Sequence, residues 1–356
     1  MLIKGIPADK SENFCDPFDP EFMLAKTINY ETPVRSSFGS FGTTTHKWIS
    51  GVIHPNGKIY GIPYSASSIL EIDPTTRATR LFAPQGSTSY KWFGATLAAN
   101  GKIYCCPYNS TGILEIDPLT DSTAIIGSGL GNGIYAPGAL AKNGKVYFGA
   151  RNGTNLLELD PETKAYRNIP IPNCPAMEIK WSDAVSHPNG KLYFIPRSSP
   201  SILEFDPETE EMRHIGNIAG TYKYGGACIA PNRKIYCVPN YGSSILEYDP
   251  YTDDLVEFGN FGTGVDKWFG LVLAPNGRLY GIPRAHASIL EINPNTRALN
   301  LLGAYGTTTL KWVSGILAPN GKIFGLPQDA QTVLEIDTLH IPQKPELCFH
   351  RYYNGR

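Results

Sequence analysis

Short apolar runs separated by turn residues occupy most of the chain, and one arrangement of them recurs. The stretch 55–74, PNGKIYGIPYSASSILEIDP, holds a turn, an apolar run, a serine-rich gap, a second apolar run and another turn. Short apolar runs bounded by Asn-Gly and Asp-Pro turns are typical of β-strands. The repeated stretches lack the 3.6-residue period of a helix, so the pattern predicts an all-β protein.

Two anchors a constant distance apart define the repeat. Turn asparagines recur at intervals of 43 to 46 residues, at Asn56, Asn100, Asn143, Asn189, Asn232, Asn276 and Asn320. Fifteen residues after each stands a glutamate, at Glu71, Glu115, Glu158, Glu204, Glu247, Glu291 and Glu335. Each unit fits four short strands, and the fourth varies most, as expected at an outer edge. Repeated four-stranded units of this length predict a single β-propeller of seven blades.

The chain ends indicate how the ring of blades closes. The last unit ends in VLEIDTLHIPQ without an evident fourth strand, and residues 33–48 match residues 297–312 in layout. We therefore expect residues 33–40 to supply the outer strand of the last blade, which leaves no open sheet edge at the seam. The predicted organisation is an N-terminal extension at 1–28, the propeller at 29–338 and a C-terminal tail at 339–356.

The rhythm IYGIP…SILEIDPTT resembles the repeats of kelch-type propellers, which carry a similar Asp-Pro turn, and those of streptogramin-lyase-like seven-bladed proteins. The resemblance covers about residues 45–337 and implies the seven-bladed fold. The paired glycines of kelch repeats are missing, because single glycines stand at Gly61, Gly281 and Gly325. The catalytic histidine and metal-holding acids of the lyase-like propellers have no clear counterpart, so their activity is not carried over.

Several residues recur in every unit and are expected to be structural. Five tryptophans and two tyrosines share one position, eight residues before the asparagine, where they would wedge neighbouring blades apart. Small residues five and six before the asparagine would line a central channel. The repeated glutamates need partners if buried: the base two residues after the asparagine, a tyrosine hydroxyl or backbone N–H groups.

Composition narrows the classes of function. A formal net charge of −1 over 356 residues argues against nucleic-acid binding, and no apolar run approaches the about 18 residues of a membrane span. Seven cysteines without a CxxC pair, and a start without a signal-peptide pattern, predict an intracellular, cytoplasmic location. The Cys105–Cys106 pair is expected in the core. The histidines are scattered, with only His54 and His187 at equivalent positions, so we predict no catalytic residue, no metal and no cofactor.

Two faces of the propeller differ in how much they vary. Because strands alternate in direction, the Asn-Gly and Asp-Pro turns share one face, and these turns barely change. The loops before strand one and between strands two and three share the opposite face, which we name the loop face. Variation on a fixed scaffold is where specificity usually resides. The second loop set begins with Tyr64, Tyr108, Arg151, Arg197, Asn240, Arg284 and Gln328.

Basic residues recur on the loop face. Lysine precedes the wedge aromatic in six units, at Lys47, Lys91, Lys180, Lys223, Lys267 and Lys311, and the third unit has Ile134 there but carries Arg151 nearby. Around the channel mouth these cations would bind a phosphate, a carboxylate or an acidic peptide. Alternatively, each lysine lies on its tryptophan and pairs with a local acid. Arg197, Arg284 and Asp183, the one acid in the small-residue segment of a first strand, complete the candidate ligand-binding set.

Three functions remain open at this point. The residue pattern favours a non-enzymatic protein-interaction or assembly scaffold that uses the loop face to bind a protein partner or join a larger assembly. The first alternative is a binder of a small anion or carbohydrate at a lysine-lined channel mouth. The second is a lyase or hydrolase of the streptogramin-lyase-like type, which a metal held by inner-strand side chains would indicate. Neither nucleic acid nor membrane insertion is predicted.

Overall fold

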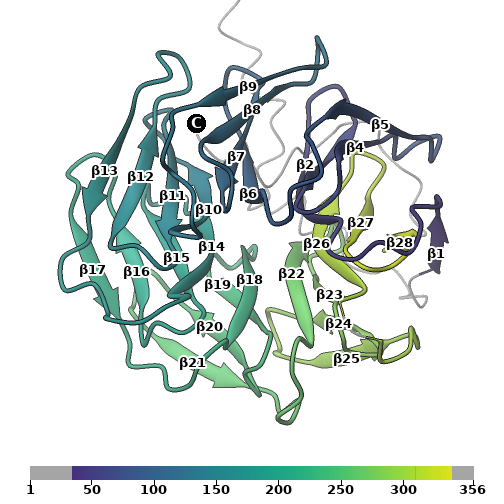
Figure 1. Cartoon of the computed structure of the whole chain (residues 1–356). Helices are drawn as coiled ribbons and strands as arrows, with labels where there is room; N and C mark the ends of the chain where they lie inside the picture. Colours follow the sequence, from purple (N-terminus) through teal and green to yellow (C-terminus); the bar gives the residue numbers. More distant parts are fainter. Residues whose placement is uncertain (1–33, 309, 339–356) are drawn as a thin grey trace, which may run out of the picture.

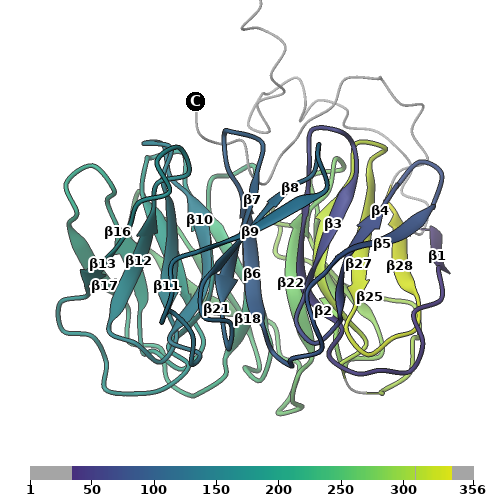
Figure 2. The ribbon, with the colours of Figure 1, turned by 45° about the horizontal axis from the view of Figure 1, so that its top comes forward.

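The computed structural model describes residues 34–308 and 310–338, and all regular elements in this part of the chain are β-strands. They form seven four-stranded sheets around a central axis (Figure 1). Figure 2 shows the strands running between two faces, with turns and loops gathered at the strand ends. The predicted seven-bladed all-β propeller is confirmed. The predicted extensions at 1–28 and 339–356 lie outside the described residues.

Each blade runs from an inner to an outer strand. Blades 1 to 3 are β2 (Trp48–Ile53), β3 (Ile59–Pro63), β4 (Ser68–Ile72) and β5 (Thr79–Pro84); β6 (Trp92–Leu97), β7 (Ile103–Pro107), β8 (Ile113–Asp117) and β9 (Ser122–Ile126); and β10 (Tyr135–Leu140), β11 (Val146–Ala150), β12 (Asn155–Leu159) and β13 (Tyr166–Pro170). Blades 4 to 6 are β14 (Trp181–Ser186), β15 (Leu192–Pro196), β16 (Ile202–Phe205) and β17 (Met212–Ile215); β18 (Tyr224–Ile229), β19 (Ile235–Pro239), β20 (Ile245–Tyr248) and β21 (Leu255–Phe258); and β22 (Trp268–Leu273), β23 (Leu279–Pro283), β24 (Ile289–Ile292) and β25 (Leu299–Leu302). Within the described residues, no helix is long and apolar enough to cross a membrane.

Blade 7 is built from both ends of the chain. It consists of β26 (Trp312–Leu317), β27 (Lys322–Pro327), β28 (Val333–Asp337) and, as its outer strand, β1 (Val34–Phe38). β1 runs antiparallel to β28, with Ser36 opposite Glu335 (Figure 1). The predicted closure is confirmed, and the strand lies inside the predicted range 33–40. Pairing the ends in one ladder removes the exposed sheet edge that the seam would otherwise have.

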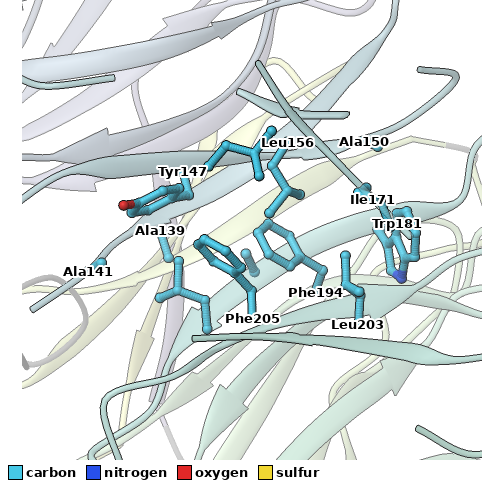
Figure 3. Close-up of a cluster of buried hydrophobic side chains, with 13 residues drawn as sticks. Ala139, Ala141, Tyr147, Ala150, Leu156, Ile171, Trp181, Phe194, Leu203 and Phe205 are labelled. Atoms are coloured by element: carbon cyan, nitrogen blue, oxygen red, sulfur yellow. The ribbon is translucent and has the colours of Figure 1, made fainter. Parts of the chain in front are cut away.

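The hydrophobic core lies between neighbouring blades. Trp48 of blade 1 packs in one cluster with Ile316 and Leu326 of blade 7. A second cluster joins blades 3 and 4, where the aromatic rings of Tyr147 and Phe205 lie 4.9 Å apart (Figure 3). The indole N–H of each tryptophan also donates to a main-chain carbonyl oxygen beside the third strand of its own blade. The packing of Trp48 against the neighbouring blade confirms the predicted wedge role.

The seven repeated glutamates are buried and ion-paired. In every blade the base two residues after the turn asparagine lies 2.8–2.9 Å from the carboxylate. In several blades a tyrosine hydroxyl also donates, as Tyr280 does to Glu291 at 2.8 Å. Two of the predicted partner types are therefore present. Every repeated glutamate is therefore paired with a cation of its own blade.

A second cation reaches most of these glutamates by one of two routes. In blade 1, Arg80 of the outer strand pairs with Glu71, and its other side pairs with Asp121 from the turn of blade 2 at 2.6 Å. In blade 2 the outer-strand position is Ala124, and Lys164 from the turn of blade 3 reaches Glu115 instead. On the face formed by the Asn-Gly and Asp-Pro turns, the turn face, both arrangements balance the negative charge of the glutamate with cations of its own blade or of the next blade.

Candidate functional site

The inner strands enclose a cavity of about 120 Å³ along the propeller axis. Small residues such as Ser50, Gly94 and Gly270 form its walls. At Gly138 a Cβ would lie only 2.0 Å from the carbonyl oxygen of Tyr147, so no larger residue fits there without a backbone shift. The expectation that small residues line a central channel is confirmed.

Asp183 of β14 lies in the wall of this cavity. Its carboxylate accepts hydrogen bonds from the backbone N–H of Ala184 at 3.0 Å and of Ala227 at 3.2 Å. Since Ala227 belongs to β18, the carboxylate joins the inner strands of two blades. These contacts give Asp183 a structural role, and a ligand-binding role for it stays a prediction.

An apolar cluster lies at the loop-face end of the channel. It consists of Ile49, Phe269 and Val313, with Phe93 and Tyr64 packed against it. The first three and Phe93 are each the second residue of an inner strand, one residue from its loop-face end. The aromatic rings of Phe93 and Phe269 approach to 6.4 Å. Side chains above this cluster therefore stand over an apolar floor.

The first residues of the loops between strands two and three gather above this floor. We name these seven the mouth residues: Tyr64, Tyr108, Arg151, Arg197, Asn240, Arg284 and Gln328. The rings of Tyr64 and Tyr108 lie 5.7 Å apart, and the Arg151 guanidinium lies 4.8 Å above the Tyr108 ring. On the other side, Arg284 Nε donates to Gln328 Oε1 at 3.1 Å. Positions that the sequence singled out from different blades thus meet at one place.

The three mouth arginines are not equally matched. Arg284 pairs with Asp266 at 2.5 Å. The Arg197 guanidinium lies 5.3 Å from the ring of Tyr222 and 5.7 Å from that of Phe269, and its side chain has no hydrogen bond or ion pair with the residues described. Burial and repulsion from Arg284 lower the pKa of Arg197 to about 10. The side chain is half-buried, and the carboxylate of Asp266 acts on it electrostatically without forming an ion pair with it.

Two mouth amides hold buried atoms that are also unmatched. Asn240 Oδ1 and Gln328 Nε2 have no hydrogen-bond partner among the described residues. Buried polar atoms without partners are exceptions in folded proteins and call for a specific explanation. Two buried polar atoms without partners therefore lie among the mouth residues, beside the half-buried cation of Arg197.

The six loop-face lysines have a different environment from the one expected. Each is only 2–5% exposed, and each ammonium donates to main-chain carbonyl oxygens of the surrounding loops. Lys223, for example, reaches Ser199 O at 2.7 Å and Gly220 O at 2.9 Å. Burial lowers the pKa of all six, to about 8 for Lys223 and Lys311.

These contacts change the picture of the charges at the mouth. None of the six lysines pairs with a carboxylate in the described part of the chain, so the predicted pairing with a local acid is not found there. The ammonium groups of Lys91, Lys223, Lys267 and Lys311 instead join the two loop sets, because carbonyl oxygens of both sets accept their hydrogen bonds. A ligand-binding role for the lysines stays an untested prediction, and the positive charges that reach the mouth are those of the arginines.

Sequence reasoning missed a further set of positions. The residue before each lysine has a left-handed backbone, with φ of 57° at His46, 59° at Tyr90, 54° at Ile179, 53° at Tyr222, 51° at Asp266 and 57° at Leu310. In blade 3 the equivalent residue is Gly133, with φ of 65°. Left-handed positions favour glycine, and only one blade has glycine here, so the sequence held no signal for them.

Histidine, cysteine and acidic groups show no gathering in the described residues. His54 and His187 each contact a carbonyl oxygen in the next blade, at 3.0 and 2.8 Å. Cys105 and Cys106 are fully buried, and burial raises the pKa of both thiols. No three His, Cys, Asp or Glu side chains of the described residues are placed to hold a metal ion.

Comparisons with known proteins agree with this architecture. No family model and no curated protein sequence match the chain. The structure is similar to streptogramin B lyase, with a TM-score of 0.73 and 11% identity over 88% of this chain and 100% of that one. It is equally similar to a catalytically inactive histidine-to-alanine variant of virginiamycin B lyase from Staphylococcus aureus with quinupristin (TM-score 0.73, 10% identity, 86% of this chain and 100% of that one).

A third similar structure is the extracellular domain of a putative hybrid two component system from B. thetaiotaomicron, with a TM-score of 0.66 and 12% identity over 87% of this chain and 40% of that one. At these identities the likeness shows the fold alone. The class of protein is therefore a seven-bladed β-propeller with four-stranded blades, similar in structure to the streptogramin-lyase-like propellers. The kelch likeness remains one of repeat pattern, and the cytoplasmic location remains a prediction.

Proposed function

We propose that the chain is a non-enzymatic binding protein whose partner docks on the loop face, over the mouth residues. One observation carries this proposal: the Arg197 cation stands among aromatic rings without an anionic partner among the described residues. An anionic group on a docked partner would supply the missing charge and displace little else. The primary role would then be that of an interaction module or assembly scaffold.

The contrast between the two faces supports the same surface. On the turn face the repeated glutamates and their cations match one another blade by blade. On the loop face the mouth residues change from tyrosine to arginine to amide around one axis, although they occupy one position of the repeat. Loops on a rigid scaffold are the usual place for binding residues.

A small anion or a carbohydrate is a second candidate ligand for the same mouth. Arg151 and Arg197 would provide the cationic contact in place of the lysines, and the tyrosines would provide a flat surface. A lyase or hydrolase activity is supported only by likeness of fold, and fold alone does not carry function from one protein to another.

The test compares three forms of the full chain in capture from an extract of the producing cells. Arg197→Met combined with Tyr90→Gly alters the loop face, and Lys142→Met alters an exposed lysine at an Asn-Gly turn of the other face. Captured proteins and heat-released small molecules are both quantified by mass spectrometry. We expect one enriched set that is lost with the loop-face variant and retained with the control. The same set on all three forms, or a loss only with Lys142→Met, would refute the proposal.

A further inference from the structure

The geometry points to the chemistry of the ligand: we propose that the mouth binds a group with a planar apolar portion and one carboxylate. The carboxylate would sit between Arg151 and Arg197, and the planar portion would lie against Tyr64, Phe93 and Tyr108. This inference rests on the proposed function and deepens it, because it names the class of ligand that the same surface recognises.

The cationic half of the site comes from two arginines with free donor edges. Arg284 is engaged by Asp266 and Gln328, whereas the side chains of Arg151 and Arg197 form no hydrogen bond or ion pair with the described residues. Each of the two lies over an aromatic ring. Stacking uses the flat face of a guanidinium and leaves its N–H edge available, and that edge matches a carboxylate in a two-point contact.

The apolar half of the site is a partly exposed group of aromatic side chains. The ring of Tyr64 lies 6.0 Å from Phe93, 5.7 Å from Tyr108 and 4.8 Å from Tyr90. Tyr64, Phe93 and Tyr108 are all half-buried, so their rings offer surface to a ligand while the floor beneath them is closed. Because Arg151 stacks on Tyr108, the charged and apolar halves are continuous.

One glycine packs directly against this junction. A Cβ on Gly133 would lie 3.5 Å from Arg151 Nη1 and 3.5 Å from the Tyr108 ring. Other blades carry Ile179 and Leu310 at the same repeat position, so the loop itself accepts bulk. In blade 3 the equivalent residue is the buried Gly133, which packs against the Arg151–Tyr108 pair without a side chain.

The left-handed tyrosines flank the same area. In blade 3 glycine, Gly133, occupies the residue before the lysine position. Tyr90 and Tyr222 occupy the same position in blades 2 and 5, at φ values that disfavour a side chain. The first extends the aromatic group around Tyr64, and the second lies under Arg197. Because six of the seven blades hold a non-glycine residue in this conformation, the conformation belongs to the repeat, and the two tyrosines contribute to the mouth through the position of their rings.

The test measures binding of defined probes to the full chain by isothermal titration calorimetry. The probes are 3-phenylpropionate, its neutral amide 3-phenylpropanamide and inorganic phosphate. We expect the acid to bind at least about tenfold more tightly than the amide, because charge-assisted hydrogen bonds are lost in the amide. Phosphate should bind more weakly than the acid, since it has no planar portion. Equal binding of acid and amide, or phosphate as tight as the acid, would overturn the proposal.

Variants locate the site. Arg197→Met keeps the packing stem and should weaken binding of the acid about tenfold, and Gly133→Leu should also weaken it, because a side chain there would press on Arg151 and Tyr108. Lys142→Met is the matched control and should bind as the unchanged chain does. Circular dichroism and melting temperature confirm that each variant is folded. Unchanged affinity in both folded loop-face variants would place the ligand elsewhere and refute the assignment.

Two further arms separate the possible sources and the two proposals. Peptides ending in phenylalanine, with a free or an amidated carboxyl, distinguish a chain terminus from a free small acid. If no acid binds while Arg197→Met with Tyr90→Gly still abolishes capture, the ligand class is wrong and the proposed function stands. If the same variant also leaves capture unchanged, both the ligand class and the proposed function are refuted.

Discussion

Removing both cations from Glu247 should destabilise the propeller by more than the sum of the two single losses. The carboxylate is 3% exposed and pairs with Lys234 of its own blade at 2.9 Å and with Arg297 of the next blade at 3.0 Å. Either cation alone keeps the carboxylate matched. Since both cations are partly exposed, Lys234→Met should cost about 1 kcal/mol, and Arg297→Met should have only a small effect on stability.

The double variant leaves a buried carboxylate without a cation. Burial by itself raises the pKa of Glu247, but hydrogen bonds from Arg297 and Lys234 outweigh it and lower the pKa to about 2. The difference from the ordinary value of 4.5 corresponds to about 3 kcal/mol of stabilisation of the ionised form. Losing both partners should therefore cost about 3–5 kcal/mol, more than the two single losses together.

The pH dependence gives an independent reading of the same interaction. Because the pKa of Glu247 in the folded state lies below its unfolded value, its contribution is fully present above pH 4.5 and is lost as the pH falls toward 2. In the double variant burial raises this pKa, so the loss over that window should shrink or reverse.

The assay is urea unfolding followed by tryptophan fluorescence at pH 7 and pH 3, for the unchanged chain, both single variants and the double variant. Lys142→Met is the control for removing an exposed lysine. Additive losses within about 0.5 kcal/mol, or the same pH dependence in the double variant, would show that the pair of cations does not hold the carboxylate.

Three further outcomes follow from the structure. Deleting residues 1–40 removes β1 and should lower the melting temperature, whereas deleting residues 345–356 should not. Equal melting temperatures for the full-length chain and the chain without residues 1–40 would contradict strand closure. Gly138→Ala should unfold the chain or lower its stability by at least about 2 kcal/mol in chemical denaturation, with Gly264→Ala, whose nearest neighbour is 3.9 Å away, as a silent control. With the pKa of Lys223 lowered to about 8, stability should rise from pH 8 to 10.5, and Lys223→Met should abolish that rise in pH-resolved melts.

The blade plan could be predicted because it depends on local rules that recur. The constant gap between Asn56 and Glu71 excludes insertions, and the Asn-Gly and Asp-Pro turns mark the strand ends, so strand count and closure follow. The partner of Glu71 could also be named among the candidates, because a base stands two residues after the turn asparagine in every unit, as Lys58 does in blade 1. In each case the assignment made in one copy of the repeat is supported by the same residues in the other copies.

The site was predicted only in part, because its environment depends on contacts between loops. The sequence around Lys223 is compatible with an ammonium group in solvent at the channel mouth and with one bound by main-chain carbonyl oxygens. Only the path of the two loops decides between these environments. The left-handed backbone at Tyr90 was invisible, since tyrosine is not a residue that marks such a position. Arg197 was recognised as a candidate, but the lack of a partner is a three-dimensional property.

Variation between blades does not by itself indicate a binding site, and the turn face shows why. Where blade 2 has Ala124 instead of an arginine, Lys164 of the next blade reaches Glu115, and where blade 1 has Arg80, the next turn supplies Asp121. These changes on that face are offset by a change in a neighbour, as selection for stability alone would produce. The mouth position of Arg197 also differs between blades, yet no described residue forms an ion pair with Arg197, and Asp266 acts on it only from a distance. A cation without an ion pair is available to a partner outside the fold, and this separates Arg197 from the equally variable bases of the turn face.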